Sequence, residues 1–308
     1  MIELSVVIPM HNEAEVIPYL FERLRLCLEK VTENYEIICI DDGSRDSTVS
    51  LLKEYNKQDP RVKLVCLARN FGKEAALTCG IDYAAGRAVI PIDADLQDPP
   101  ELIPALVAKW KEGYKVVLAT RVNRPGDSWM KRKSAEWFYR AINRVSTVKI
   151  PSNTGDFRLM DRQVVDAVKK LPERTRFMKG IFAFAGFSTA IIRFDREARA
   201  AGTTSWNYWN LWKFALEGIF SFTTVPLHVW TYLGGFISFA SFIYMLVIIT
   251  RTLVYGNAVH GYASLMVAVL FMGGMQLLSI GIIGEYVGRI YNETKQRPIY
   301  LVEETSGV

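Results

Sequence analysis

The feature that most constrains the fold is a series of apolar, β-branched runs that alternate with segments long enough for a helix. Such alternation is typical of a parallel sheet whose strands are buried on both faces and connected by helices. The first part of the chain is therefore predicted to be a doubly wound α/β domain. The five runs are Leu4 to Ile8, Glu36 to Ile40, Val62 to Leu67, Ala88 to Ile92 and Lys115 to Ala119.

Two of the intervening segments carry residues at helical spacing. Leu20, Leu24 and Leu28 recur every fourth residue, which places them along one face of a helix. The segment before Gly86 gathers mostly small residues on one face and is also predicted to be a helix. The residues of this second face are Ala75, Ala76, Cys79, Gly80 and Tyr83.

Polar or charged residues follow each run at the point where the strand is expected to end. In open α/β sheets, ligands bind beyond the carboxyl ends of the strands. Each of these short sequences alone is an ordinary turn or helix cap, but five of them converging on one crevice indicate a site. They are Pro9 to Glu13, Asp41 to Ser44, Ala68 to Gly72, Asp93 to Asp95, and Thr120 with Arg121.

An acidic pair, Asp93 and Asp95, follows the fourth run and precedes the double proline Pro99-Pro100. Carboxylates at this place can hold a divalent cation, Mg²⁺ or Mn²⁺, that bridges to substrate phosphates. Taken alone, such a pair is more often part of a turn. No G-x-G-x-x-G or G-x-x-x-x-G-K-[ST] sequence is present, so any phosphate must be held by a metal and by basic side chains.

Length, net charge and cysteine content do not restrict the protein to one functional class. The 308 residues carry a formal net charge of +5, which suits a membrane surface or an anionic substrate without requiring either. The four cysteines lack metal-site or redox spacing and are expected to be reduced and buried. The N-terminus has no basic region before the first run, so no signal peptide is expected and the domain should stay in the cytoplasm.

A basic segment with many aromatic residues extends from Arg121 to Arg158. Within it, residues 129–145 have an apolar, aromatic stripe and a basic stripe at helical spacing. This pattern predicts an amphipathic helix at a membrane interface, and the apolar stripe argues against nucleic acid as the partner. An ordinary amphipathic helix packed on the domain is the alternative.

Two apolar segments near the C-terminus are long enough to cross a bilayer. Val229 to Ile249 and Tyr262 to Ile283 are uncharged, and about 20 such residues span a hydrocarbon core. The predicted domains are therefore 1–205 for catalysis, 206–226 as a juxtamembrane helix, 227–288 as a two-helix transmembrane hairpin and 289–308 as a cytoplasmic tail. Basic residues on both outer sides place the termini in the cytoplasm of a multi-pass inner-membrane protein.

Small residues in the second apolar segment would allow close packing of helices. Gly284 and Gly288 are four residues apart, and Gly281 precedes them. Such spacing favours helix contacts within one chain or between two chains. A homo-oligomer is therefore one expectation.

The ordered strand-end motifs resemble those of the family-two glycosyltransferases with a GT-A fold. Within that family they are most similar to the polyprenyl-phosphate glycosyltransferases, which include dolichyl-phosphate mannose synthase and the bactoprenol glucosyltransferases. The resemblance rests on Pro9 to Glu13, Asp41 to Thr48, Arg69 to Lys73, and Asp93 to Gln97 with Pro99-Pro100. It implies inverting transfer of a sugar from a nucleotide sugar to polyprenyl phosphate, with glucose and UDP expected.

The resemblance also implies roles for individual residues. Donor-binding residues would be Pro9, His11, Glu13, Asp41, Asp42, Arg69, Asp93, Gln97 and Arg121, with Asp93 and Asp95 also holding the metal. The catalytic group would comprise Asp95, Asp156 on the acceptor side and Arg199 on a loop that closes over substrate, and the acceptor phosphate would meet Lys131, Lys133 and Arg158. His11 stands where relatives usually have Tyr or Phe, and Trp206 where they usually have Lys.

Several alternatives share these features. Within the enzymes, the donor could be GDP-mannose or an amino-arabinose nucleotide, and the acceptor a dolichyl phosphate. A processive polysaccharide synthase resembles a longer chain with a Gln-x-x-Arg-Trp sequence, which does not occur here. Outside the enzymes, the chain could be a nucleotide-sugar-binding membrane scaffold without turnover.

Overall fold

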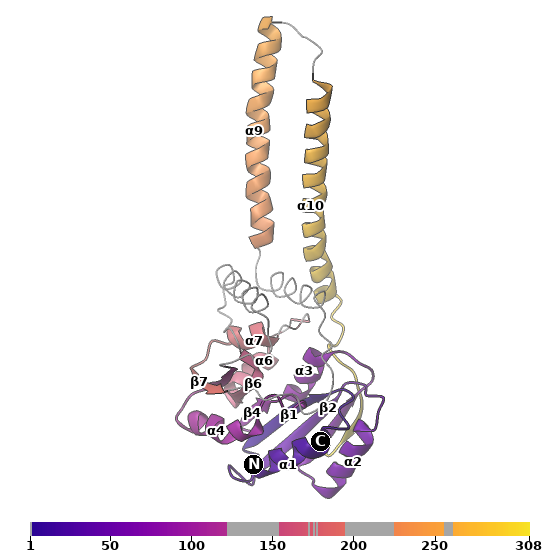
Figure 1. Cartoon of the computed structure of the whole chain (residues 1–308), viewed down its shortest axis with the longest axis vertical. Coiled ribbons are helices and arrows are strands. Elements are labelled where there is room, and N and C mark those ends of the chain that lie inside the picture. The colour runs from indigo at the N-terminus through magenta and orange to yellow at the C-terminus, as the bar shows by residue number, and fades with distance from the viewer. Residues whose placement is uncertain are drawn as a thin grey trace.

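The five apolar runs form strands of a single eight-stranded sheet (Figure 1). The computed structural model describes residues 2–121, 154–194 except 172, 175 and 177, then 225–255 and 261–308. The sheet order is β7-β5-β6-β4-β1-β2-β3-β8. The strands are β1 (Leu4–Met10), β2 (Tyr35–Asp41), β3 (Val62–Leu67), β4 (Ala88–Pro91), β5 (Val116–Arg121), β6 (Thr154–Asp161), β7 (Thr189–Phe194) and β8 (Val302–Ser306).

The strand directions confirm a mostly parallel α/β sheet. Strands β1, β2, β3 and β4 pair in parallel, as do β5 and β7. Strand β6 lies between β4 and β5 and is antiparallel to both, so β5 runs in the same direction as β4. The carboxyl ends of β1 to β5 therefore share one edge of the sheet, and the beginning of β6 lies at that same edge.

Helices cover both faces of the sheet because the strand residues alternate between two cores. Val6 and Ile8 pack on one face with Leu24 of α1, whereas Val7 packs on the other face with Ala76 of α3. The helices of the domain are α1 (Ile17–Leu28), α2 (Thr48–Gln58), α3 (Lys73–Tyr83), η1 (Pro100–Leu102), α4 (Ile103–Lys111), α6 (Arg162–Lys169) and α7 (Met178–Phe184). The two helices predicted between the first five strands from residue spacing are confirmed as α1 and α3.

Helix α3 lies unusually close to β1. A Cβ atom at Gly80 would stand 2.1 Å from Cγ1 of Val7 and 3.1 Å from Cγ1 of Ile40. Only glycine fits at this contact without moving the helix, so the small-residue face of α3 allows the helix to lie directly on the sheet. This close approach fixes the position of the helix whose first residue is Lys73.

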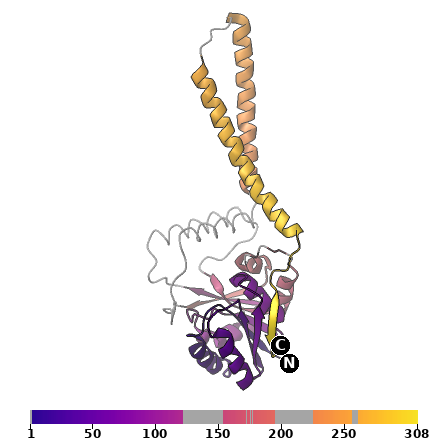
Figure 2. The ribbon, with the colours of Figure 1, turned by 90° about the vertical axis from the view of Figure 1, so that its right-hand side faces the viewer.

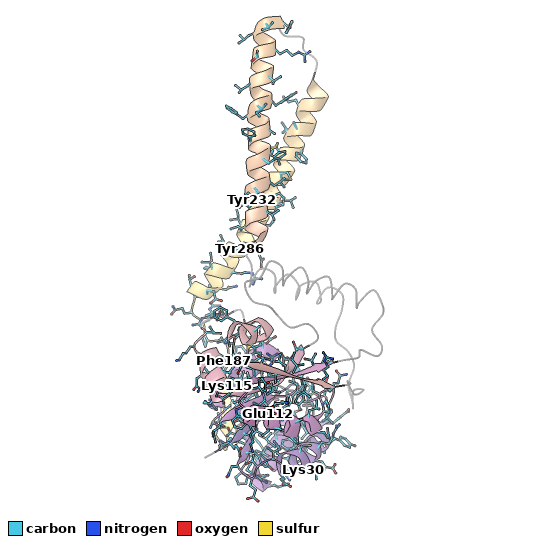
Figure 3. All side chains as sticks on the ribbon, turned by 90° about the vertical axis from the view of Figure 1, so that its left-hand side faces the viewer. Lys30, Glu112, Lys115, Phe187, Tyr232 and Tyr286 are labelled. Atoms are coloured by element: carbon cyan, nitrogen blue, oxygen red, sulfur yellow. The ribbon has the colours of Figure 1, made fainter. Side chains whose placement is uncertain are left out.

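Two long helices, α9 (Val225–Tyr255) and α10 (Tyr262–Thr294), form an extended hairpin beyond the α/β domain (Figure 1). Figure 3 shows Tyr232 and Tyr286 on the part of the hairpin nearest the domain, whereas Lys30 lies at the far end of the domain. Many large apolar side chains of α9 and α10 are exposed, including Phe236, Leu253 and Leu277.

Within the described residues, no helix is both long enough and apolar enough to cross a membrane. The two predicted spans therefore stay predictions. The predicted helices over 129–145 and 206–226 lie outside the described residues, except for the last two residues of the second, which begin α9.

The C-terminal segment returns to the α/β domain after α10 (Figure 2). Strand β8 pairs antiparallel with β3 and forms the last strand at that edge of the sheet. The Tyr300 hydroxyl donates to Asp82 Oδ2 of α3 at 2.9 Å, and the backbone N–H of Ala68 donates to the carbonyl of Leu301 at 2.9 Å. The predicted tail, 289–308, thus contributes a strand to the α/β domain, which was not expected from the sequence.

We expect Gly80→Ala to destabilise the domain by about 1–3 kcal/mol, because the added methyl group overpacks the contact between α3 and β1. Thermal or denaturant unfolding of the full chain in detergent would measure the loss. Gly281→Ala is the matched control, since nothing lies within 4 Å of the Cβ position at this helical glycine. Equal stability of the two variants would contradict the tight contact.

Candidate functional site

The loops that follow β1 and β2 are joined by side-chain hydrogen bonds at the carboxyl edge of the sheet. The backbone N–H of Asn12 donates to Ser44 Oγ at 2.8 Å, and that of Glu13 donates to Thr48 Oγ1 at 2.9 Å. In return, Asn12 Oδ1 accepts from the backbone N–H of Arg45 at 2.8 Å. Asn12 has a φ of 57°, which asparagine tolerates better than most residues. The two predicted donor-binding loops therefore form one rigid unit.

The two aspartates at the end of β2, Asp41 and Asp42, have different roles. Asp42 is 4% exposed, and its carboxylate accepts from the backbone N–H groups of Phe71 at 2.7 Å and Gly72 at 2.8 Å. Asp41 instead lines a cavity, while its Oδ2 accepts from the backbone N–H of Ser44 at 3.1 Å. Asp42 was predicted to line the nucleoside pocket, but the structure uses both of its oxygens to hold the loop after β3.

Gly43 lets the loops after β2 and β3 touch. Its φ is +70°, and a Cβ atom there would stand 2.7 Å from the backbone nitrogen of Asn70. The ring of His11 lies against the same loops, with Nδ1 2.9 Å from the carbonyl oxygen of Asp42. Arg69 places its guanidinium over the Phe71 ring, 4.1 Å from the centroid.

A cavity of about 700 Å³ opens beside these loops. His11, Asp41 and Arg69, all predicted to bind the donor, are among the residues that line it. Glu303 and Glu304 of β8 form part of its wall, and Glu304 also pairs with Lys53 at 2.6 Å. Pro9 lies in β1, opposite Ile40. The C-terminal strand thus contributes to the cavity, which was not expected from the sequence.

The charged centre of the rim is Lys73, whose ammonium group meets two carboxylates. The Lys73 ammonium is 2.7 Å from Asp93 Oδ1, 2.8 Å from Asp93 Oδ2 and 2.9 Å from Asp156 Oδ2. Protein atoms crowded around the ammonium act to lower the pKa of Lys73. The carboxylates of Asp93 and Asp156 outweigh that effect, so the pKa lies above its ordinary value. Asp93 was predicted to bind the donor and Asp156 to lie on the acceptor side. The Lys73 ammonium group contacts both.

The turn after Asp93 has a strained backbone. Leu96 has a φ of 57°, a left-handed conformation that is costly for a bulky residue, and its side chain is 3% exposed. Asp95 Oδ1 accepts from the backbone N–H of Gln97 at 3.2 Å across this turn. The burial of Leu96 holds the two flanking polar residues at the rim, where both were predicted.

Arg121, predicted to bind the donor, forms an ion pair with the buried carboxylate of Asp98. Its Nη2 is 3.0 Å from Asp98 Oδ1, and the Asp98 side chain is 2% exposed. Burial raises the pKa of Asp98, and Arg121 acts in the opposite direction. A Cβ atom at Gly155 would stand 3.1 Å from Arg121 Nη2, so the beginning of β6 passes close over this pair.

Arg158 was predicted to bind the acceptor phosphate, yet its side chain lies inside the domain. The residue is 4% exposed and its guanidinium stacks on the Phe182 ring, 4.4 Å from the centroid. Its Nη2 donates to the carbonyl of Gly155 at 2.7 Å. Burial lowers the pKa of Arg158 to about 10, although Asp156 and Glu74 favour its charged form. In this position Arg158 supports the backbone next to Asp156.

The remaining predicted residues lie outside the described part of the chain: Lys131, Lys133 and Arg199. In the described part, no three His, Cys, Asp or Glu side chains come together as a ready-made metal site. Mg²⁺ is commonly held by only one or two carboxylates, with substrate phosphates and water as the other ligands. Asp93 and Asp95 fit a cation of that kind, which binds together with a diphosphate.

Sequence reasoning missed Lys73 and Asp98 as site residues. Lys73 stands directly after Gly72 at the end of the third strand-end motif, and Asp98 stands between Gln97 and the double proline. Both belong to sequences that already indicated the site. Their proximity to Asp156 and Arg121 is the signal, and it arises only in the folded chain.

The comparisons with known proteins agree with this geometry. Residues 5–169 match the family model Glycosyl transferase family 2, and residues 225–290 match the GtrB C-terminal hairpin. The first match covers more than half of the chain. The chain belongs to glycosyl transferase family 2, so the predictions of a glycosyltransferase and of the GT-A type of α/β fold are confirmed.

The relatives match almost the whole chain. An uncharacterised glycosyltransferase of Synechocystis is 58% identical over 100% of this chain and 96% of its own length. The bactoprenol glucosyl transferase of Shigella phage SfV is 50% identical over 98% of each chain. Among solved structures, glucosyl-3-phosphoglycerate synthase from Mycobacterium tuberculosis is 19% identical, with a TM-score of 0.47 over 71% of this chain and 76% of that one.

We expect Asp42→Ala to lower the free energy of unfolding by about 2–4 kcal/mol, because two buried backbone N–H groups lose a charged acceptor. Denaturant unfolding of the full chain in detergent would measure this effect. Asp166→Ala is the control, since its carboxylate is 55% exposed and lies 3.7 Å from Arg162, and the expected loss is below about 0.5 kcal/mol. A similar loss in both variants would show that Asp42 does not hold the loop.

Proposed function

We propose that this protein transfers glucose from UDP-glucose to polyprenyl phosphate, with inversion at the anomeric carbon. The observation that carries the proposal is the meeting of Asp93 and Asp156 at one ammonium group. It lies in a chain that is 50% identical to a bactoprenol glucosyl transferase over 98% of its length. In a bacterium the acceptor would be undecaprenyl phosphate.

The chemistry asks for positioning more than for a strong base. A phosphate monoester is already anionic near neutral pH, so its oxygen can attack the anomeric carbon directly. The new bond joins that oxygen to the sugar, and the bond from the sugar to UDP breaks with its electron pair going to the diphosphate. Asp156 then orients the acceptor at the beginning of β6, while the rim after β4 holds the donor.

A divalent cation is part of the proposal. Asp93 and Asp95 would hold Mg²⁺ or Mn²⁺, and such an ion supplies electrostatic stabilisation of the departing diphosphate. The strained Leu96 supports this assignment, because it keeps the adjacent Asp95 carboxylate at the rim at a cost in backbone energy. His11, Asp41 and Arg69 line the neighbouring cavity, which is of a size that accommodates a nucleoside.

We also propose that the hairpin of α9 and α10 anchors the protein in the inner membrane with the α/β domain in the cytoplasm. The uncharged segments within the two helices, the exposed apolar side chains on both and the basic residues Arg289, Lys295 and Arg297 at the domain side support this arrangement. The domain would then lie at the membrane face where a polyprenyl phosphate presents its head group.

The activity is tested by supplying a panel of labelled nucleotide sugars with undecaprenyl or dolichyl phosphate, with and without Mg²⁺ and Mn²⁺. We expect labelled lipid from UDP-glucose with undecaprenyl phosphate and a divalent cation. Asp93→Asn and Asp156→Asn should each lower kcat by about 100-fold or more, in the range seen when one electrostatic contact to a reacting group is removed.

Asp166→Asn is the matched control for these variants, because it removes a carboxylate from the exposed face of α6 and should leave turnover unchanged. Preference for GDP-mannose would support the mannose synthase alternative. If no donor gives labelled lipid although the chain binds UDP, the proposal of an enzyme is wrong and a nucleotide-sugar-binding scaffold is favoured.

The membrane arrangement can be tested with single cysteines, because the four native cysteines are buried. In right-side-out vesicles, we expect a membrane-impermeant maleimide to label Tyr255→Cys at the end of α9. Lys30→Cys, at the far end of the domain (Figure 3), should be labelled only after the membrane is permeabilised. Equal labelling of both positions in sealed vesicles, or release of the protein by alkaline carbonate, would contradict the anchor.

A further inference from the structure

Lys73 joins the donor and acceptor sides of the rim through Asp93 and Asp156, and its position in the fold is well defined. It is the first residue of α3 and follows Gly72, whose φ is +97°. The buried carboxylate of Asp42 accepts a hydrogen bond from the backbone N–H of Gly72 at 2.8 Å. Gly80 lets α3 lie directly on β1. The backbone position from which the Lys73 side chain extends is therefore fixed.

The ammonium group occupies the carboxylate oxygens that a metal ion would need. Both oxygens of Asp93 lie within 2.8 Å of Lys73 Nζ, and Asp156 adds a third oxygen at 2.9 Å. Mg²⁺ and Mn²⁺ bind through the same kind of carboxylate oxygen. The Lys73 side chain is 46% exposed, so ions from solution can reach the cluster. An ammonium group and a divalent cation cannot both hold Asp93 in this way.

Without a cation, two carboxylates this close would repel each other. Like charges repel each other more strongly near a protein surface than in bulk water, because the effective dielectric constant is lower there. Lys73 removes that repulsion and keeps the two strand ends together. A divalent cation alone would have to displace the ammonium, whereas a cation that arrives with a diphosphate brings additional ligands of its own.

We propose that Lys73 is a positioning residue that sets the spacing of Asp93 and Asp156 and competes with the divalent cation for Asp93. The competition makes the cation enter with the donor nucleotide instead of before it. The proposal rests on the proposed function, because the cation and the nucleotide belong to that function. It goes further in assigning a role to Lys73, which ends the motif Arg69 to Lys73 but receives no role from the resemblance or the comparisons.

The test measures Mn²⁺ binding to the full chain in detergent by the electron paramagnetic resonance signal of free Mn²⁺, with and without UDP. Lys73→Met should bind Mn²⁺ without UDP at least about tenfold more tightly than the unmodified protein, because one competing positive charge is gone. The gain should shrink when UDP is present. Transfer of sugar by Lys73→Met should fall, since Asp93 and Asp156 lose their common partner.

Two further variants separate this role from general effects of charge. Lys73→Arg keeps a cation and should bind Mn²⁺ as the unmodified protein does. Lys109→Met removes a lysine from an ion pair with Glu112 at 2.8 Å on the surface of α4 and should also leave Mn²⁺ binding unchanged. Thermal unfolding checks that each variant is folded, and Lys73→Gln replaces Lys73→Met if the methionine variant does not fold.

The outcomes distinguish the two proposals. If the unmodified protein binds Mn²⁺ with UDP but Lys73→Met shows unchanged or weaker affinity, competition by Lys73 is wrong and the proposed function stands. If the unmodified protein binds no Mn²⁺ with or without UDP, the cation in the proposed function is wrong and the role of Lys73 falls with it. Tighter binding by Lys109→Met as well would attribute the effect to net charge.

Discussion

The direction of strand β6 determines where the reactive groups of this protein lie. Because β6 is antiparallel to β4 and β5, its first residues reach the edge where the other strands end. Its eight residues span about 26 Å at 3.3 Å per residue. A parallel β6 would therefore place Asp156 near the opposite edge of the sheet, far from Asp93. The ion contacts of Lys73 with both carboxylates depend on this one reversal.

The alternating apolar runs were sufficient to predict five strands and their common edge. Strands buried on both faces require continuous apolar sequence, and the two cores of the sheet show that requirement directly. Strand β8 could not be found in this way, because Val-Glu-Glu-Thr-Ser is mostly polar and exposed. Its place is set by backbone pairing with β3, more than 230 residues earlier in the chain, and such pairing leaves no local pattern.

The strand-end motifs located the site but did not separate its tasks. Asp41 and Asp42 are neighbours in sequence, yet one lines a cavity and the other is fully used by the loop after β3. Arg158 lies two residues after Asp156 in β6, so the two start on the same face of the strand. Arg158 lies deeper in the domain, where it stacks on Phe182. These distinctions depend on depth and packing partners, which the sequence does not display.

The acidic residues at the rim affect how two anionic substrates can bind there. At the rim, Lys73 contacts Asp93 and Asp156, and Arg121 contacts Asp98. Asp95 is a fourth carboxylate, close to Asp93 in the sequence. A diphosphate donor and a phosphate acceptor would add further negative charge to an edge that is already acidic. Attraction of both substrates therefore requires added positive charge, which a divalent cation and the basic segment between Arg121 and Arg158 can supply. The ion contacts of Lys73 with Asp93 and Asp156 balance part of the negative charge of this edge, and further positive charge would balance the anionic donor and acceptor.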